Sequence, residues 1–98
     1  MAKVIDPGGT QIAGVRSLVT FHRKRVLEIG CGDGRLTWEV AGEARSVLAV
    51  DPDRDSIATA RAALSPNLAE TVMFRVAGAA EVDVSRCSID LVFFSWSL

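Results

Sequence analysis

The sequence predicts an α/β fold: a doubly wound parallel sheet, cut down to about four strands in the order 3-2-1-4. Two observations predict it. Short apolar runs alternate along the chain with segments of helical periodicity, which is the pattern of strand–helix–strand units with right-handed crossovers. These runs lack polar alternation, as strands do when both faces of a parallel sheet are covered. With 98 residues, the chain has room for one hydrophobic core, so we expect a single domain.

The first part of the chain leads into the sheet. Residues 6–9 form the loop signal Asp-Pro-Gly-Gly. From Thr10 to about Thr20 the apolar residues recur at roughly helical spacing, which predicts a helix. A turn is expected at residues 21–24, followed by a short buried strand at residues 25–29.

Two helices and a second strand come next. We expect a helix from Arg35 to about Gly42, and an apolar strand at residues 47–50. Asp53 to Ser56 offers helix N-caps for a helix at residues 57–64. Pro66 follows and is expected to close that helix.

The chain then returns twice more to the sheet. Residues 72–76 are expected to form a third strand, and residues 78–88 a loop that includes one turn of helix at most. Residues 90–95 form the most apolar strand of the four. In the order 3-2-1-4 this fourth strand is an edge, yet it has no Lys or Pro to protect it. We therefore expect it to pair with a second copy or with a complementing chain.

Composition excludes several classes of protein. Eleven Lys and Arg against twelve Asp and Glu leave a formal net charge of -1, so charge gives no signal for nucleic acid or a membrane surface. The basic run at residues 22–25 is expected to be a solvated turn. No apolar run approaches the roughly 18–20 residues of a membrane span. Cys31 and Cys87 fit neither a disulfide framework nor a metal site, which favours a reduced, cytoplasmic protein.

The segment Gly30-Cys31-Gly32-Asp33-Gly34 is the most informative part of the sequence. It lies between a strand and a helix, where an open α/β sheet binds ligands and the helix directs its amides at them. The spacing differs from that of a P-loop and from Gly-x-Gly-x-x-Gly, so a dinucleotide is the less favoured alternative. The carboxylate of Asp33 is a poor neighbour for a pyrophosphate. It suits a ligand with a cationic centre and no phosphate.

Asp51 ends the second strand about twenty residues beyond these glycines. A carboxylate at this place can accept hydrogen bonds from both hydroxyls of a ribose. The alternative is that Asp51 merely caps the helix that begins near Asp55, with Pro52 as a turn former.

These segments resemble the class I S-adenosylmethionine-dependent methyltransferases. Residues 26–36 and 47–51 are similar to the first two motifs of that family, residues 74–81 to its third-strand segment, and residues 88–98 to its fourth strand. The resemblance therefore runs from about Lys24 to the last residue. It implies a Rossmann-like fold with S-adenosylmethionine as cofactor.

The resemblance also implies roles for individual residues. The methionine part of the cofactor would be surrounded by Glu28 and by the loop residues Gly30, Cys31, Gly32 and Gly34. Asp51 would hold the ribose, with Pro52, Ala79 and Ala80 beside the adenine and Ser95 near the transferred methyl group. Many family members have an Asp where Ala79 stands, which accepts a hydrogen bond from the adenine amino group. Its loss costs roughly 1 kcal/mol. No catalytic residue and no metal ligand is assigned.

The other chemically distinctive side chains have structural interpretations. We expect His22 to face solvent in a turn, Cys31 to be small and buried rather than a reactive thiol, and Trp38 to pack in the core. Trp96 is equally compatible with a core position and with a place beside the substrate.

The family sheet has seven strands, so the sequence corresponds to a partial methyltransferase domain. Residues 1–23 would form its N-terminal loop and helix, and residues 24–98 its cofactor-binding half. Two functions remain open. The chain is a methyltransferase, or a fragment of one, that acts on an unidentified acceptor. Alternatively, it is a non-catalytic S-adenosylmethionine-binding remnant or a split-protein part that acts through a partner. We expect the chain alone to be too short for activity.

Overall fold

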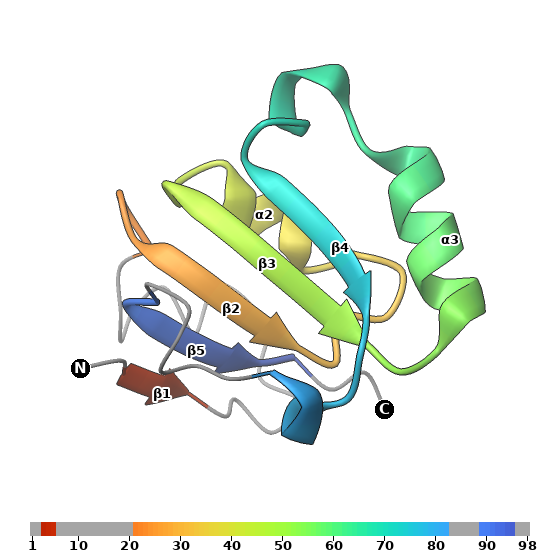
Figure 1. The fold of residues 1–98 in the computed structure, drawn as a ribbon. Helices are drawn as coiled ribbons and strands as arrows, with labels where there is room; N and C mark the ends of the chain where they lie inside the picture. The colour runs from red at the N-terminus through yellow and green to blue at the C-terminus, as the bar shows by residue number, and fades with distance from the viewer. Residues whose placement is uncertain (1–2, 6–20, 83–88, 96–98) are drawn as a thin grey trace.

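The protein is a parallel sheet with helices on one face (Figure 1). The computed structural model describes residues 3–5, 21–82 and 89–95. Its strands lie in the order β1-β5-β2-β3-β4, and every neighbouring pair is parallel. The predicted helix at residues 10–20 lies outside the described residues.

The four predicted strands are present in the predicted order. They are β2 (Arg25–Ile29), β3 (Ser46–Asp51), β4 (Val72–Val76) and β5 (Leu91–Phe94). Read as β4-β3-β2-β5, they give the order 3-2-1-4. Every strand limit lies within one residue of expectation, and at β5 the residues Asp90 and Ser95 flank the strand. The Rossmann-like fold class is therefore confirmed.

A fifth strand corrects one expectation. Strand β1 (Lys3–Ile5) pairs in parallel with β5, so that Val4 lies opposite Val92. The expectation that β5 forms the edge of the sheet is therefore wrong. Because β1 occupies that side of β5, a second copy or a complementing chain has no open β5 edge to pair with. Three residues are too few to show a strand pattern in the sequence, which is why β1 was not predicted.

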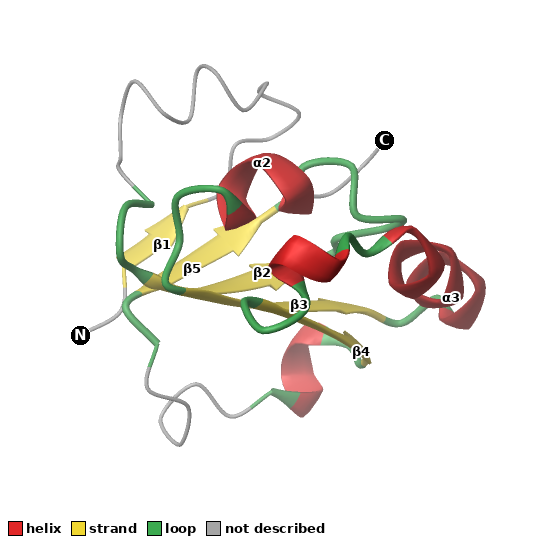
Figure 2. Cartoon of the chain, turned by 90° about the horizontal axis from the view of Figure 1, so that it is seen from above, coloured by secondary structure: helices red, strands yellow, loops and turns green. Residues whose placement is uncertain are grey.

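Helices α2 (Thr37–Ala41) and α3 (Arg54–Ala63) cover the same face of the sheet (Figure 2). Both differ from expectation at their starts. Helix α2 begins two residues late because residues up to Leu36 still belong to the turn after the glycine loop. Helix α3 begins three residues early because Asp53 caps it, accepting a hydrogen bond from the Asp55 amide at 3.1 Å. Pro66 opens a short 3-10 turn, η1 (Pro66–Leu68), rather than simply closing α3.

The main hydrophobic core lies between the sheet and these helices. Phe21, Phe93, Val40 and Ile57 are fully buried in it. The rings of Phe21 and Phe93 meet edge to face at 5.8 Å, which fixes the turn before β2 against β5.

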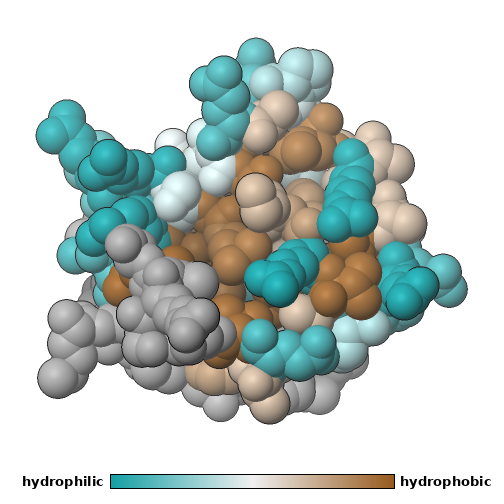
Figure 3. Space-filling view, viewed as in Figure 1, coloured by the Kyte–Doolittle hydropathy of each residue, from teal (hydrophilic) through white to brown (hydrophobic). Residues whose placement is uncertain are grey.

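The opposite face of the sheet carries a second, smaller cluster that includes Leu27, Val50 and Val92. Among the described residues, it is covered by the segment after β4 with its 3-10 turn, η2 (Ala79–Glu81). Apolar side chains remain visible on this face in Figure 3. Among the described residues, Met73 is a large apolar side chain that is 66% exposed.

Candidate functional site

The carboxyl ends of the strands bring the predicted site residues to one edge of the sheet. In the register of the sheet, Ile29 lies beside Val50 on one side and Phe94 on the other. Asp51 lies beside Val76. The residues that follow these strands are therefore neighbours, although they come from four separate parts of the sequence. The glycine loop, Asp51 and Ser95 therefore lie at one edge of the sheet.

The glycine loop has a backbone conformation that residues with a side chain rarely adopt. The φ angles of Gly30, Gly32 and Gly34 are 79°, 58° and 92°, all in the region that favours glycine. The amides of Gly30 and Cys31 both donate to the Val50 carbonyl, at 2.8 and 3.1 Å. The loop therefore crosses over the end of β3 and is fixed there.

Gly34 is required by packing as well as by its backbone angle. A Cβ at this position would lie 3.0 Å from a ring atom of Trp38 and 3.3 Å from Phe74. Those two rings meet edge to face at 5.4 Å, which confirms the packing role of Trp38. Gly34 thus lets α2 approach the sheet. Its predicted contact with the cofactor stays a prediction.

Asp51 joins the glycine loop to the start of α3. Its Oδ2 accepts a hydrogen bond from the Gly32 amide at 2.9 Å, and its Oδ1 accepts one from the Asp53 amide at 2.9 Å. The cap of α3 is Asp53, whose carboxylate also accepts from the Ser56 hydroxyl. The alternative that Asp51 caps this helix is therefore wrong.

A carboxylate can accept about four hydrogen bonds. Two acceptor positions of Asp51 are taken by the backbone amides of Gly32 and Asp53. This leaves about one lone pair on each oxygen, which matches the two hydroxyls of a ribose. Asp51 is half-buried at the strand end, so it keeps access to solvent.

Glu28 is the most buried acid of the described residues. Its side chain is 0% exposed, and its two carboxyl oxygens are hydrogen-bonded to the hydroxyls of Thr37 and Ser95. Burial raises the pKa of the Glu28 carboxyl, and the two hydroxyl contacts act in the opposite direction. The sequence predicted Glu28 at the site but missed Thr37. Its signal was a hydroxyl residue at the start of the helix that follows the loop.

Ser95 lies beside Glu28 rather than in the open. It is 5% exposed, and its hydroxyl also lies 3.3 Å from the Gly30 carbonyl. Its amide donates to the Ile29 carbonyl at 3.0 Å. Ser95 therefore joins the end of β5 to the base of the glycine loop. The prediction that it adjoins the transferred methyl group stays a prediction.

Cys31 is a buried packing residue, as the sequence predicted. It is 4% exposed within the main core. Burial, together with the nearby carboxyl groups, raises the pKa of its thiol to about 12. The thiol is thus protonated at neutral pH and is a poor nucleophile.

The predicted adenine side of the site is more exposed. Pro52, Ala79 and Ala80 are all exposed, and the Ala77 amide donates to the Asp51 carbonyl at 3.0 Å. The segment that begins η2 is thereby tied to the strand end that carries Asp51. Glu81 is the acid in η2, and its Oε1 accepts a hydrogen bond from the Gly78 amide at 2.9 Å.

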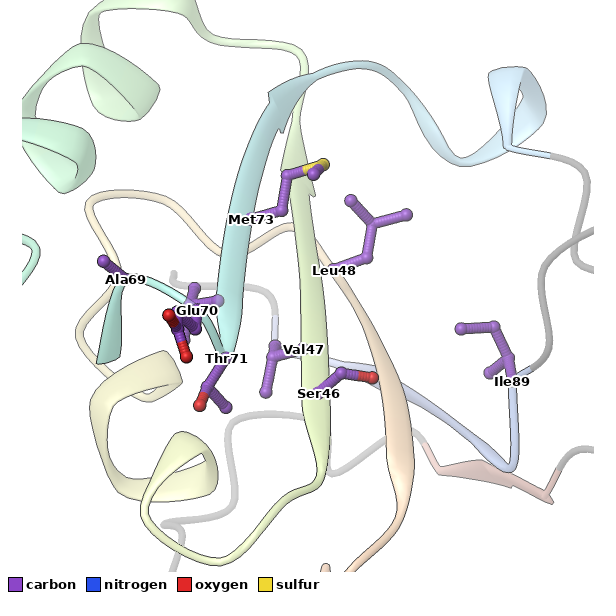
Figure 4. Close-up of a pocket in the computed structure, with 9 residues that line it drawn as sticks. Ser46, Val47, Leu48, Ala69, Glu70, Thr71, Met73 and Ile89 are labelled. Atoms are coloured by element: carbon purple, nitrogen blue, oxygen red, sulfur yellow. The ribbon is translucent and has the colours of Figure 1, made fainter. Parts of the chain in front are cut away.

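A separate cavity of about 280 Å³ lies at the other end of the strands (Figure 4). It is lined by Ser46 and Val47 at the start of β3, by Thr71 and Val72 at the start of β4, and by Met73. Its place at the amino ends separates it from the glycine loop.

Among the described residues, no group of His, Cys, Asp or Glu is arranged to hold a metal ion. No helix in those ranges is long and apolar enough to cross a membrane.

The methyltransferase domain family matches residues 26–98, which include every element of this site. This chain belongs to that family. A curated relative, phosphoethanolamine N-methyltransferase 1 of Triticum aestivum, is 34% identical over 83 residues, covering 83% of this chain and 16% of the relative. The class I S-adenosylmethionine-dependent methyltransferase resemblance is thereby confirmed.

Solved structures agree with this assignment. Phosphoethanolamine N-methyltransferase 1 of Haemonchus contortus, in complex with phosphoethanolamine and S-adenosylhomocysteine, gives a TM-score of 0.69 at 29% identity, over 85% of this chain and 17% of that one. An S-adenosylmethionine-dependent methyltransferase of Mesorhizobium loti gives 0.73 at 23% identity, over 87% and 38%. The second match shows the fold alone. This chain spans about a sixth of the length of the two phosphoethanolamine enzymes. S-adenosylmethionine is the cofactor of the family.

Proposed function

We propose that this chain binds S-adenosylmethionine at the carboxyl edge of the sheet, as the cofactor-binding part of a methyltransferase. The observation that carries the proposal is the hydrogen bond from the Gly32 amide to the Asp51 carboxylate. It joins the first two motifs of the family in one site. The methionine part would lie along the glycine loop, and the ribose would lie on Asp51.

The chemistry of the site suits this cofactor. Asp33 and Asp51 place negative charge around the loop, which favours a cationic ligand over a phosphate. The backbone of Gly32 and Gly30 leaves no Cβ in the path of a ligand. When bound, S-adenosylmethionine supplies an already activated sulfonium methyl group. The contribution of this chain is then to hold the cofactor in a fixed orientation.

Methyl transfer by the whole protein, and a cytoplasmic location, are part of the same proposal. The first acceptor to test is phosphoethanolamine, because the Haemonchus contortus structure contains it. Radiolabelled methyl transfer, with S-adenosylmethionine as donor, measures this directly. Other amines serve as comparison acceptors in the same assay.

Calorimetry of the 98-residue chain tests the binding step by itself. We expect S-adenosylmethionine and S-adenosylhomocysteine to bind with one-to-one stoichiometry, and NADH to give no heat. Gly32→Val should abolish binding, because a branched side chain fills the approach to the loop. Gly42→Ala, a change in an exposed glycine at the end of α2, is the matched control and should bind normally. No heat with either ligand at millimolar concentration would refute the proposal.

A further inference from the structure

Glu28, Thr37 and Ser95 form a buried cluster that is one proton short of pairing every acceptor within the protein. It contains three acceptors: the two carboxyl oxygens of Glu28 and the carbonyl oxygen of Gly30. Two hydroxyl protons are available, one on Thr37 and one on Ser95. The Thr37 hydroxyl donates to Oε1 of Glu28. The single Ser95 proton cannot serve both Oε2 of Glu28 and the Gly30 carbonyl, although its oxygen lies within hydrogen-bonding distance of both.

A carboxyl proton on Glu28 completes the count. The heavy-atom positions leave the direction of the contact between Glu28 and Ser95 open. If Oε2 carries a proton, it donates to Ser95 Oγ, and the Ser95 hydroxyl is free to donate to the Gly30 carbonyl. Every polar atom of the cluster is then paired within the protein. Such pairing is the rule for buried groups, and the side chains of Glu28, Thr37 and Ser95 are buried while Gly30 is half-buried.

We propose that Glu28 is a positioning residue that acts as a neutral carboxylic acid, donating through Ser95 to hold the Gly30 carbonyl of the glycine loop. In this role it joins three elements, since Thr37 belongs to α2 and Ser95 follows β5. Its protonation rests on the hydrogen bonds of the cluster and on the burial of Glu28. Its effect on cofactor binding rests on the proposed function.

The surroundings of Glu28 disfavour a charge. Its neighbours in the sheet are Ala49 and Phe93, both 0% exposed, and its two hydroxyl partners are uncharged. Burial outweighs their hydrogen bonds and raises its pKa. Most of the described titratable groups on the elements around it are acidic. Cys31, Asp33 and Asp51 lie near the loop. Glu39 lies in α2, and Arg35, the one cation among these groups, precedes it; both are exposed. Asp33 and Asp51 oppose a further negative charge.

The pH dependence of stability tests the proposal. A carboxyl group whose pKa is raised on folding contributes stability below its unfolded pKa, and loses it as pH rises toward the folded pKa. Relative to Glu28→Gln, the folding equilibrium constant of the wild-type protein should fall about tenfold per pH unit between about pH 4.5 and about pH 7, the range in which the unfolded chain ionises and the folded protein keeps the carboxyl proton. Glu70→Gln removes an exposed acid at the far end of the sheet. That variant is the control in the same titration.

Glu28→Gln should also fold at pH 7, because its amide can donate to Ser95 and its oxygen can accept from Thr37. An infrared band of a protonated carboxyl group at pH 7 should be present in the wild type and missing in Glu28→Gln.

Three results would overturn the proposal. They are a Glu28→Gln protein that does not fold, a relative stability that is flat or rises with pH, and an absent infrared band. Failure of the wild-type protein to bind S-adenosylhomocysteine would refute the proposed function instead. It would leave the stability profile and the infrared band to decide the state of Glu28.

Discussion

Gly34 and Gly42 offer a pair of identical substitutions with opposite expected effects. Gly34 has a φ of 92°, and an added Cβ would lie 3.0 and 3.2 Å from two ring atoms of Trp38. Gly42 has a φ of -63° and ψ of -22°, and the nearest atom to its added Cβ is the Glu39 carbonyl oxygen at 3.7 Å. The first position therefore resists a side chain, and the second accepts one.

The loss in the free energy of unfolding expected for Gly34→Ala has two parts. An alanine in a left-handed conformation costs roughly 1–2 kcal/mol. Overpacking against the rings of Trp38 and Phe74 adds about 1–3 kcal/mol. The free energy of unfolding should therefore fall by about 2–5 kcal/mol. Gly42→Ala should raise it by about 0.4–1 kcal/mol, because alanine restricts the unfolded chain.

Urea unfolding followed by tryptophan fluorescence measures both variants, with circular dichroism as a second probe. In a domain of this size each kcal/mol moves the melting temperature by roughly 4–8 °C, so the two variants should separate clearly. In a Trp38→Leu background, Gly34→Ala should cost less stability than it does in the wild type, because the close contact with the Trp38 ring is removed. The cost of the backbone conformation should remain. A Gly34→Ala protein within about 0.5 kcal/mol of wild type, which is the scale of an ordinary surface substitution, would refute the packing explanation.

Three further predictions concern other parts of the chain. Ala79→Asp should tighten S-adenosylhomocysteine binding by about two- to tenfold in calorimetry, since it restores an acceptor for the adenine amino group; unchanged affinity would remove Ala79 from the adenine side. In a Cys87→Ser protein, Cys31 should resist thiol reagents at pH 8 until the protein is unfolded, because its pKa is about 12; rapid labelling of the native protein would contradict its burial. Asp90 accepts from the Arg25 backbone and guanidinium at 2.9 Å, which lowers its pKa. Its stabilisation is present above the unfolded pKa and lost as pH falls, so the advantage of wild type over Asp90→Asn in urea unfolding should shrink below about pH 4; an advantage independent of pH would argue against this ion pair.

Much of the fold could be predicted from local patterns. The apolar runs that form β2, β3 and β5 are long enough to be recognised, and a parallel order follows from the helices between them. Strand β1 could not be predicted, because Lys3–Ile5 gains its strand character by pairing with β5. Tertiary contact decides such short strands.

The site was predicted less completely, for physical reasons that differ from residue to residue. The sequence Asp51-Pro52-Asp53 offers two carboxylates near one helix start, and geometry decides which of them reaches the Asp55 amide. Thr37 is recognisable as a hydroxyl residue at a helix start, but nothing in the sequence indicates that its partner is Glu28, nine residues earlier. Gly34 was assigned to the ligand, whereas its neighbours Trp38 and Phe74 supply a packing reason for glycine. Pairings across elements are visible only after folding.

The proposed function requires that Asp51, which accepts a hydrogen bond from the Gly32 amide, binds the ribose of S-adenosylmethionine. Comparison of Asp51→Asn with Asp53→Asn tests it most directly, because both remove one negative charge and asparagine remains a good cap for α3. Calorimetry with S-adenosylhomocysteine, on variants whose melting temperatures confirm folding, should show about 10- to 100-fold weaker binding for Asp51→Asn, the range for hydrogen bonds to a charged group. Asp53→Asn should bind as the wild type does. Equal affinity in the two variants would contradict the account.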